Sequence, residues 1–296
     1  MGVFGKRFEI KFIPKPQSYN SFTTIIAYKR ALRLDTGVKK AILLFLVVFV
    51  TWQAIYAVAL VLPALYNYWL ISYLIVLVVI IVFFALDKQR INDLGLKKDS
   101  FWKISIILGI TFAVIYNVYW VLVGTPILSA VPVRIISHGI FSIPYNILFA
   151  ITVGVVEETT FRGYILRNFS NAYSNVKAIA YSSVLFGLYH LSLILALTST
   201  TSALDTISYW ILFVLAAVLA GAFLGYFYLR TSKSTIGPIT YHTLSVYIES
   251  LIPFTIATSA IIGHLFSTTI YVLFIPLLVL IFRKQKPLPR NSGKSA

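Results

Sequence analysis

Apolar runs of about 20 residues recur along this chain, and they constrain its fold more than any other feature. A helix needs about 20 such residues to cross the hydrocarbon core of a bilayer. The composition agrees, since 59% hydrophobic and 11% charged residues are far from the averages of soluble proteins. The predicted spans lie near residues 39–63, 68–86, 102–123, 135–157, 177–197, 207–229, 235–257 and 265–282. We therefore expect an all-α polytopic membrane protein, a bundle of about eight transmembrane helices.

The Lys and Arg residues fall on one side of this eight-span arrangement. Of the 25, all except Arg134 lie in the first 40 residues, from residue 283 onward, or in and beside the connections after the second, fourth and sixth spans. Cytoplasmic loops carry such an excess of positive charge. We therefore predict a multi-pass protein of the cell membrane with both termini in the cytoplasm. Its expected parts are a basic cytoplasmic arm (1–38), a transmembrane bundle (39–285) and a basic cytoplasmic tail (286–296).

The net charge of +16 is scattered over these cytoplasmic segments and is not clustered on one domain. The pattern therefore predicts contact with membrane lipids and no nucleic-acid partner. The absence of cysteine excludes a disulfide framework, a thiolate metal site and a cysteine nucleophile. Gly221 and Gly225 form a small-residue face that lets helices approach closely, and we expect it inside the bundle, so it specifies no oligomeric state.

Two adjacent carboxylates, Glu157 and Glu158, stand at the predicted end of the fourth span. Ionisable groups in membrane helices are costly, so they mark functional sites. Glu158 and Arg162 stand at i and i+4 with the acid first, the favourable order for an ion pair, and we expect this pair to organise the helix end. Glu157 points about 100° away and is expected to face inward as a general base. The alternative is that all three side chains only snorkel to the membrane surface.

Two histidines lie in apolar segments of other spans. Counted from the cytoplasmic ends, His190 is about 20 Å deep and His242 about 10 Å deep. Because Glu157 is near the inner end of its span, a site made from these three residues would open to the cytoplasm. Two Glu and two His on three helices can activate a water molecule, which predicts an intramembrane hydrolase. Glu249 shares the helix face of His242 two turns deeper, where it would orient a histidine or pair with a hydroxyl, and Phe186 is a further candidate for a supporting residue.

The motif order Glu157-Glu158-x-x-x-Arg162, Phe186-x-x-x-His190 and then His242 resembles the CAAX prenyl protease and bacteriocin-processing (CPBP, or Abi) family. The strings EETTFRGYIL, FGLYHL and GAFLGYFYLRTSKSTIGPITYH agree with it, and the resemblance covers about residues 90–255. Family members are eight-helix intramembrane glutamate endopeptidases. Eukaryotic members remove the last three residues of prenylated CAAX proteins.

The resemblance implies a peptidase that hydrolyses a peptide bond near the C-terminus of a membrane-anchored or prenylated peptide. It implies that Glu157 is the general base and that His190 polarises the water with it. His242 would stabilise the oxyanion of the tetrahedral intermediate. Glu158 and Arg162 would support these groups.

One position departs from the family pattern. The last family motif is usually His-x-x-x-Asn, with the Asn side chain donating to the oxyanion, and here Val246 stands in the Asn position. Loss of one oxyanion donor typically costs about 10²–10³ in rate. Ser245, on the adjacent face of the same helix, is the expected substitute.

Two other interpretations remain open. The valine is compatible with a catalytically weak relative that binds a membrane partner. A Glu and His cluster is also compatible with a proton-coupled transporter, although the chain lacks the internal repeat common in transporters. No cofactor is expected. Two His and one Glu are acceptable zinc ligands, but zinc is not favoured because the chain has no His-Glu-x-x-His helix and Glu157 with His190 suffices to activate water.

Overall fold

The computed structural model describes residues 35–62, 69–97, 101–120, 122, 142–191, 203–251 and 260–283, and every regular element among them is helical. The longer helices are α2 (Thr36–Val61), α3 (Trp69–Leu86), α4 (Trp102–Tyr119), α6 (Ser142–Glu158), α8 (Asn175–Tyr189), α10 (Ala203–Arg230), α11 (Ile236–Leu251) and α12 (Ala260–Ile281). Shorter elements are the 3-10 helix η2 (Ile91–Leu94), the π-helix η4 (Thr159–Leu166) and α7 (Arg167–Ala172). The all-α prediction is confirmed. The description below concerns the compact unit that the described residues form from Gly37 onward.

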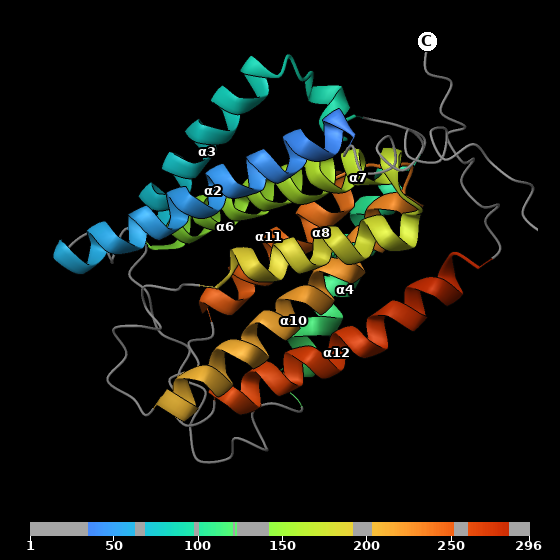
Figure 1. The fold of residues 1–296 in the computed structure, drawn as a ribbon. Helices are drawn as coiled ribbons and strands as arrows, with labels where there is room; N and C mark the ends of the chain where they lie inside the picture. The colour runs from blue at the N-terminus through green and yellow to red at the C-terminus, as the bar shows by residue number, and fades with distance from the viewer. Residues whose placement is uncertain are drawn as a thin grey trace, which may run out of the picture. The chain divides into compact units, whose positions relative to one another are not determined.

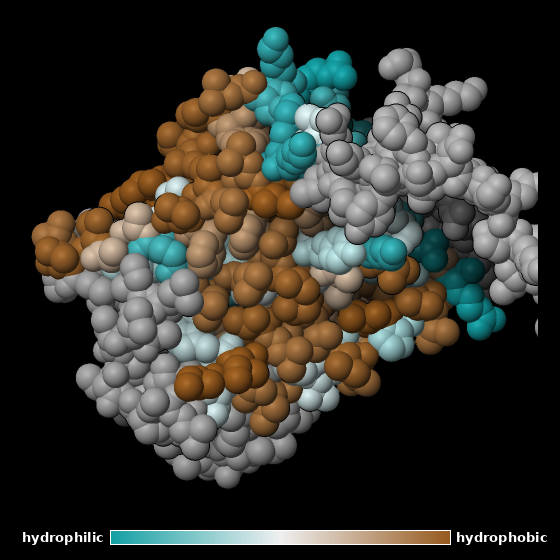
Figure 2. Space-filling model, viewed as in Figure 1, coloured by the Kyte–Doolittle hydropathy of each residue, from teal (hydrophilic) through white to brown (hydrophobic). Residues whose placement is uncertain are grey.

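Four of the described helical segments are long and apolar enough to cross a membrane. They are Thr36–Ala59, Trp69–Leu86, Trp102–Tyr119 and Trp210–Arg230. A shorter apolar segment, Ser267–Ile281, lies in α12. Figure 2 shows that one face of the molecule is broadly hydrophobic. Hydrophilic side chains gather beside the segment that follows α3. The count of eight spans and the cytoplasmic termini stay predictions.

The fourth predicted span differs in the structure. Helical structure continues from α6 through η4 and α7 to Ala172, well past the expected end at residue 157. All eight residues of η4 are buried, because apolar side chains such as Phe161 and Ile165 pack into the core. Glu157 and Glu158 therefore lie inside a continuous helical stretch, and the Glu158 pair stands at the end of α6, where the π-helix η4 begins.

α11 packs between α4 and α6, and glycine permits the close approach on both sides. A Cβ at Gly109 of α4 would lie 2.7 Å from the carbonyl oxygen of Gly237, and one at Gly154 of α6 would lie 3.1 Å from the amide nitrogen of Thr243. Neither position has room for a side chain. The place of α11, which carries His242, is therefore set by backbone contact.

α10 packs against α8 and α12, as Figure 1 shows for α12. Gly221 faces Ser183 and Phe186 of α8, while Gly225 faces Leu166 and Ile179. The prediction that this small-residue face lies inside the bundle is confirmed.

The segment after α3 is tied to η4 and α7 by hydrogen bonds. The Asp87 carboxylate accepts from the Tyr164 hydroxyl (2.6 Å), from Gln89 (2.8 Å) and from Lys40, and Arg167 donates to the Asp93 carbonyl oxygen (2.6 Å). Burial alone would raise the pKa of Asp87, but these donors outweigh it and hold the pKa below its usual value. These hydrogen bonds thus attach the segment after α3 to η4 and α7.

The contact between α4 and α11 leads to the first prediction. Gly109→Ala should destabilise the protein by about 1–3 kcal/mol, because the added methyl group would overlap the backbone of α11. Thermal unfolding in detergent measures this. Gly225→Ala is the matched control, since its Cβ would meet side-chain atoms rather than backbone, Leu166 at 3.3 Å and Ile179 at 3.6 Å. Equal unfolding temperatures of the two variants would contradict the close packing of α11.

Candidate active site

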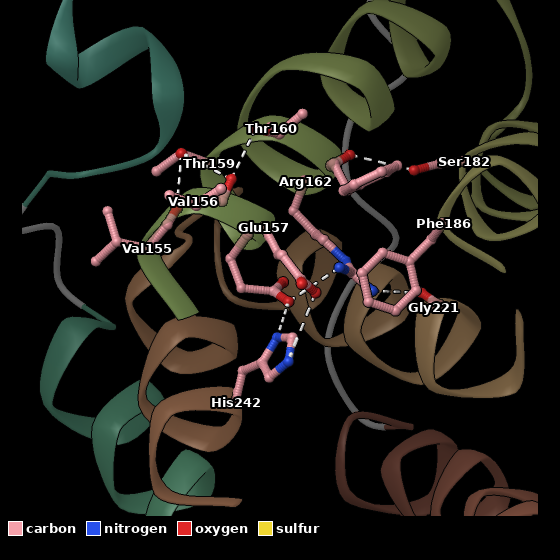
Figure 3. A network of polar contacts seen from close by, with 12 residues as sticks. Val155, Val156, Glu157, Thr159, Thr160, Arg162, Ser182, Phe186, Gly221 and His242 are labelled. Carbon is pink, nitrogen blue, oxygen red and sulfur yellow. Dashed lines mark hydrogen bonds and ion pairs between the residues drawn. The ribbon is translucent and has the colours of Figure 1, made fainter. Parts of the chain in front are cut away.

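The ion pair predicted between Glu158 and Arg162 is present and fully enclosed. Arg162 Nη1 lies 2.9 Å from Glu158 Oε1, and the two side chains are 1% and 0% exposed. The guanidinium carbon is 4.2 Å from the centroid of the Phe186 ring, and Nη2 donates to the carbonyl oxygen of Gly221 at 3.4 Å (Figure 3). Glu157 is only 1% exposed as well. This burial excludes the snorkelling alternative.

Both carboxylates stand where α6 changes into the π-helix η4. A change from i→i+4 to i→i+5 bonding disturbs the backbone partners of the preceding turn. The Thr159 hydroxyl donates to the Val155 carbonyl oxygen and the Thr160 hydroxyl to that of Val156, each at 2.7 Å. Short π-helical stretches occur often at functional sites. The Glu-Glu-Thr-Thr sequence therefore supplies both the acids and the hydroxyls that support the transition.

His242 of α11 lies between the two carboxylates (Figure 3). Its Nδ1 is 2.8 Å from Glu158 Oε1, and its Nε2 is 3.6 Å from Glu157 Oε2. A carboxylate accepts hydrogen bonds, so Nδ1 carries the proton in the neutral ring. Nε2 is then the nitrogen that faces Glu157.

His190 follows α8 as its C-cap residue. Its Nδ1 is 2.8 Å from the carbonyl oxygen of Phe186, and its Nε2 is 3.7 Å from Glu157 Oε2. A carbonyl oxygen only accepts, so Nδ1 carries the proton and Nε2 is the free nitrogen in the neutral ring. The Phe186 ring meets the imidazole edge-on at a centroid distance of 4.6 Å. Phe186 thus contacts both Arg162 and His190, behind the reacting groups.

Two imidazoles thus converge on one carboxylate oxygen. Glu157 Oε2 has no hydrogen-bond partner among the described residues, and both Nε2 atoms stand just beyond direct hydrogen-bond distance from it. One water molecule can bridge such a spacing. The His190 and His242 side chains are 21% and 15% exposed, whereas Glu157 is 1% exposed. Water therefore reaches the carboxylate from the side of the histidines.

The two histidines converge despite their predicted difference in depth, which stays a prediction. His190 was expected about 10 Å deeper than His242, yet both Nε2 atoms lie within 3.7 Å of one oxygen. Counting residues gives depth only if helices begin at one level and run parallel. α8 also ends at Tyr189, earlier than the predicted span.

Ser245 and Val246 follow His242 on α11. Ser245 is 5% exposed, and its Oγ has no hydrogen-bond partner within the described part of the chain. Val246 is half-buried. Glu249, two turns from His242, is exposed, and none of the described hydrogen bonds and ion pairs joins it to Glu157, Glu158 or the two histidines.

Sequence reasoning missed one contact of Glu157. The hydroxyl of Tyr73, on α3, donates to Glu157 Oε1 at 2.7 Å. Tyr73 lies outside the motifs and outside the segment that carries the family resemblance. An uncharged tyrosine in the most apolar predicted span gave no signal that it would reach a carboxylate.

The described residues contain no group of three or more His, Cys, Asp or Glu side chains arranged to hold a metal ion. The expectation of a metal-free site stays a prediction.

The buried ion pair leads to the second prediction. Arg162→Ala should destabilise the protein by about 3–5 kcal/mol, because it leaves the Glu158 carboxylate buried and unpaired. Arg162→Lys is the matched comparison. It keeps the charge but loses the planar group that faces Phe186, so its unfolding temperature should fall between those of the parent and Arg162→Ala. If Arg162→Ala unfolds at the parent temperature, the pair does not stabilise the fold.

Comparison with known proteins agrees with this geometry. Residues 139–248 match the family model described as type II CAAX prenyl endopeptidase Rce1-like. No curated protein and no solved structure matches the chain. The matched segment contains every residue of the Glu, Arg and His constellation. With its apolar helices, the chain is an integral membrane protein. Residues 139–248 therefore form an Rce1-like domain of the type II CAAX prenyl endopeptidases, and the resemblance to the CAAX prenyl protease and bacteriocin-processing family is confirmed.

Proposed function

We propose that this protein is an intramembrane glutamate endopeptidase that cleaves a peptide bond near the C-terminus of a membrane-associated substrate. One observation carries the proposal: the Nε2 atoms of His190 and His242 approach the same oxygen of Glu157, at 3.7 and 3.6 Å. A carboxylate oxygen between two imidazole nitrogens is suited to take a proton from a water molecule and to orient it. The match to a CAAX endopeptidase domain supports the same reaction class.

In the proposed mechanism Glu157 Oε2 accepts one proton of the water, and His190 Nε2 accepts a hydrogen bond from the other. The hydroxide that forms attacks the scissile carbonyl carbon. The proton on Glu157 then passes to the leaving amine, so the carboxylate is regenerated. The bond from His190 Nδ1 to the Phe186 carbonyl keeps the required nitrogen free.

His242 is suited to the oxyanion. The Glu158 carboxylate faces its Nδ1 and stabilises the positive charge that the ring carries when both nitrogens are protonated. Nε2–H then donates to the developing oxyanion. The buried Ser245 hydroxyl stands next to His242 in the sequence and is our proposed second donor in place of the usual Asn.

The proposed substrate is a membrane-anchored peptide of the CAAX type, prenylated near its C-terminus. The apolar outer faces of the helices suit a lipid-anchored chain that reaches the site from the bilayer. The distribution of Lys and Arg supports an opening on the cytoplasmic side.

Cleavage of CAAX-type peptides tests the function. Purified protein is incubated with prenylated and unprenylated peptides, with and without a chelator. Glu157→Gln should abolish cleavage without unfolding the protein, because the amide cannot accept the proton. The unfolding temperature of Glu157→Gln is measured alongside its activity, so that loss of the base is distinguished from loss of the fold. Normal cleavage by Glu157→Gln, or a loss with chelator that zinc restores, would overturn the metal-free glutamate mechanism. Zinc content is measured in parallel.

The valine in the Asn position leads to a further test. Positions 242 and 246 differ by about 40° around the helix, so they share a face. Val246→Asn should raise kcat, by up to about 10²–10³, if the enzyme lacks this donor, with little change in KM because the charge develops in the transition state. If Ser245 already donates, Val246→Asn should be nearly neutral and Ser245→Ala should lower kcat. If both variants cleave at the parent rate, the residues of α11 after His242 do not contact the oxyanion. That result would favour the interpretation as a catalytically weak relative.

A further inference from the structure

The second oxygen of Glu157 has a partner outside the matched domain. Tyr73 belongs to α3, and its hydroxyl donates to Glu157 Oε1 at 2.7 Å. The matched domain begins at residue 139, so this contact reaches the base from a helix earlier in the chain. α3 packs against α6, the helix that carries Glu157.

Aromatic rings hold the Tyr73 ring in place. Trp52 of α2 meets it edge-on at a centroid distance of 4.8 Å, and Phe149 of α6 does so at 5.6 Å. Trp52 is itself 3% exposed and also contacts Tyr189 at 5.8 Å. Edge-to-face contacts of this kind restrict the ring. The hydroxyl is therefore presented to Glu157 by a packed cluster that spans α2, α3 and α6.

The two oxygens of Glu157 consequently face different groups. Oε1 accepts from Tyr73, and Oε2 faces the Nε2 atoms of His190 and His242. Rotation of the carboxylate would break the bond to Tyr73, so the bond keeps Oε2 toward the histidines. The donor sits on the side away from the proposed water, so it orients the base and leaves the reacting oxygen open.

We propose that Tyr73 is a positioning residue for the general base. The inference rests on the proposed function, because it assigns a partner to the base of that reaction. A hydroxyl that donates to a carboxylate also stabilises its charged form. Four other groups face Glu157 or lie beside it: His190, His242, and the Glu158 and Arg162 pair. Tyr189 lies near both Tyr73 and Glu157. None of these donates to Oε1 among the described hydrogen bonds.

Tyr73→Phe removes the hydroxyl and keeps the ring contacts. A hydrogen bond to a charged group contributes about 1.5–3 kcal/mol, so kcat should fall by about 10- to 100-fold at the pH optimum of the parent, with KM within about twofold. The acidic limb of the kcat profile should move to higher pH by about one unit, because a carboxylate that loses a donor binds its proton more tightly. Tyr228→Phe is the control. Tyr228 is a buried tyrosine of α10, and none of its described interactions involves Tyr73 or Glu157, so loss of its hydroxyl should leave the profile unchanged.

A second substitution tests the same bond without removing it. 3-Fluorotyrosine at position 73 keeps the hydroxyl and makes it a stronger donor, so the acidic limb should move to lower pH. If both variants keep the parent profile, or if Tyr73→Phe only lowers the unfolding temperature, Tyr73 does not position the base. If either result is obtained and Glu157→Gln is inactive, only the role of Tyr73 is overturned. An active Glu157→Gln overturns the proposed function itself.

Discussion

The buried ion pair of Glu158 and Arg162 is the interaction on which the site depends. Taking two charges out of water is costly, and hydrogen bonds to their other groups offset part of that cost. Here the guanidinium lies against the Phe186 ring and donates to a backbone carbonyl, and Glu158 Oε1 accepts from both Arg162 and His242. Glu158 Oε2 has no hydrogen-bond partner among the described residues. The pair therefore joins η4, α8, α10 and α11 at one point. Glu158 also fixes the His242 imidazole, which faces the neighbouring Glu157. The buried carboxylate that stabilises the fold thus also orients a histidine of the proposed reaction.

Much of this arrangement could be predicted from the sequence. The apolar runs indicated helices throughout, and the described residues are helical. The i,i+4 spacing of Glu158 and Arg162 indicated their ion pair, since a helix brings these positions together wherever it lies. The residues Glu157, His190 and His242 were selected because ionisable groups are rare in apolar helices. These predictions depend on local geometry or on the cost of burying charge, which hold without a tertiary structure.

The remainder depends on contacts that a single sequence does not encode locally. The helix that carries Glu157 continues past its predicted end, because Phe161 and Ile165 find core partners on other helices. The histidines meet although their counted depths differ, since depth depends on where each helix starts and how it tilts. Tyr73 carries no charge and sits in an ordinary apolar helix, so only the packing of α3 on α6 reveals its contact with Glu157.

The two histidines are held in the same tautomer by different kinds of partner, and this makes them unequal under sequence change. The Nδ1 partner of His242 is a side chain, so a substitution at Glu158 reverses or frees that ring. The Nδ1 partner of His190 is a main-chain carbonyl, which every amino acid at position 186 provides. Substitutions at position 158 can therefore change the hydrogen bonding of His242, while the hydrogen bond of His190 persists for as long as the helix end exists. Position 158 is thus the place where a substitution can change the reaction while the remainder of the site is kept.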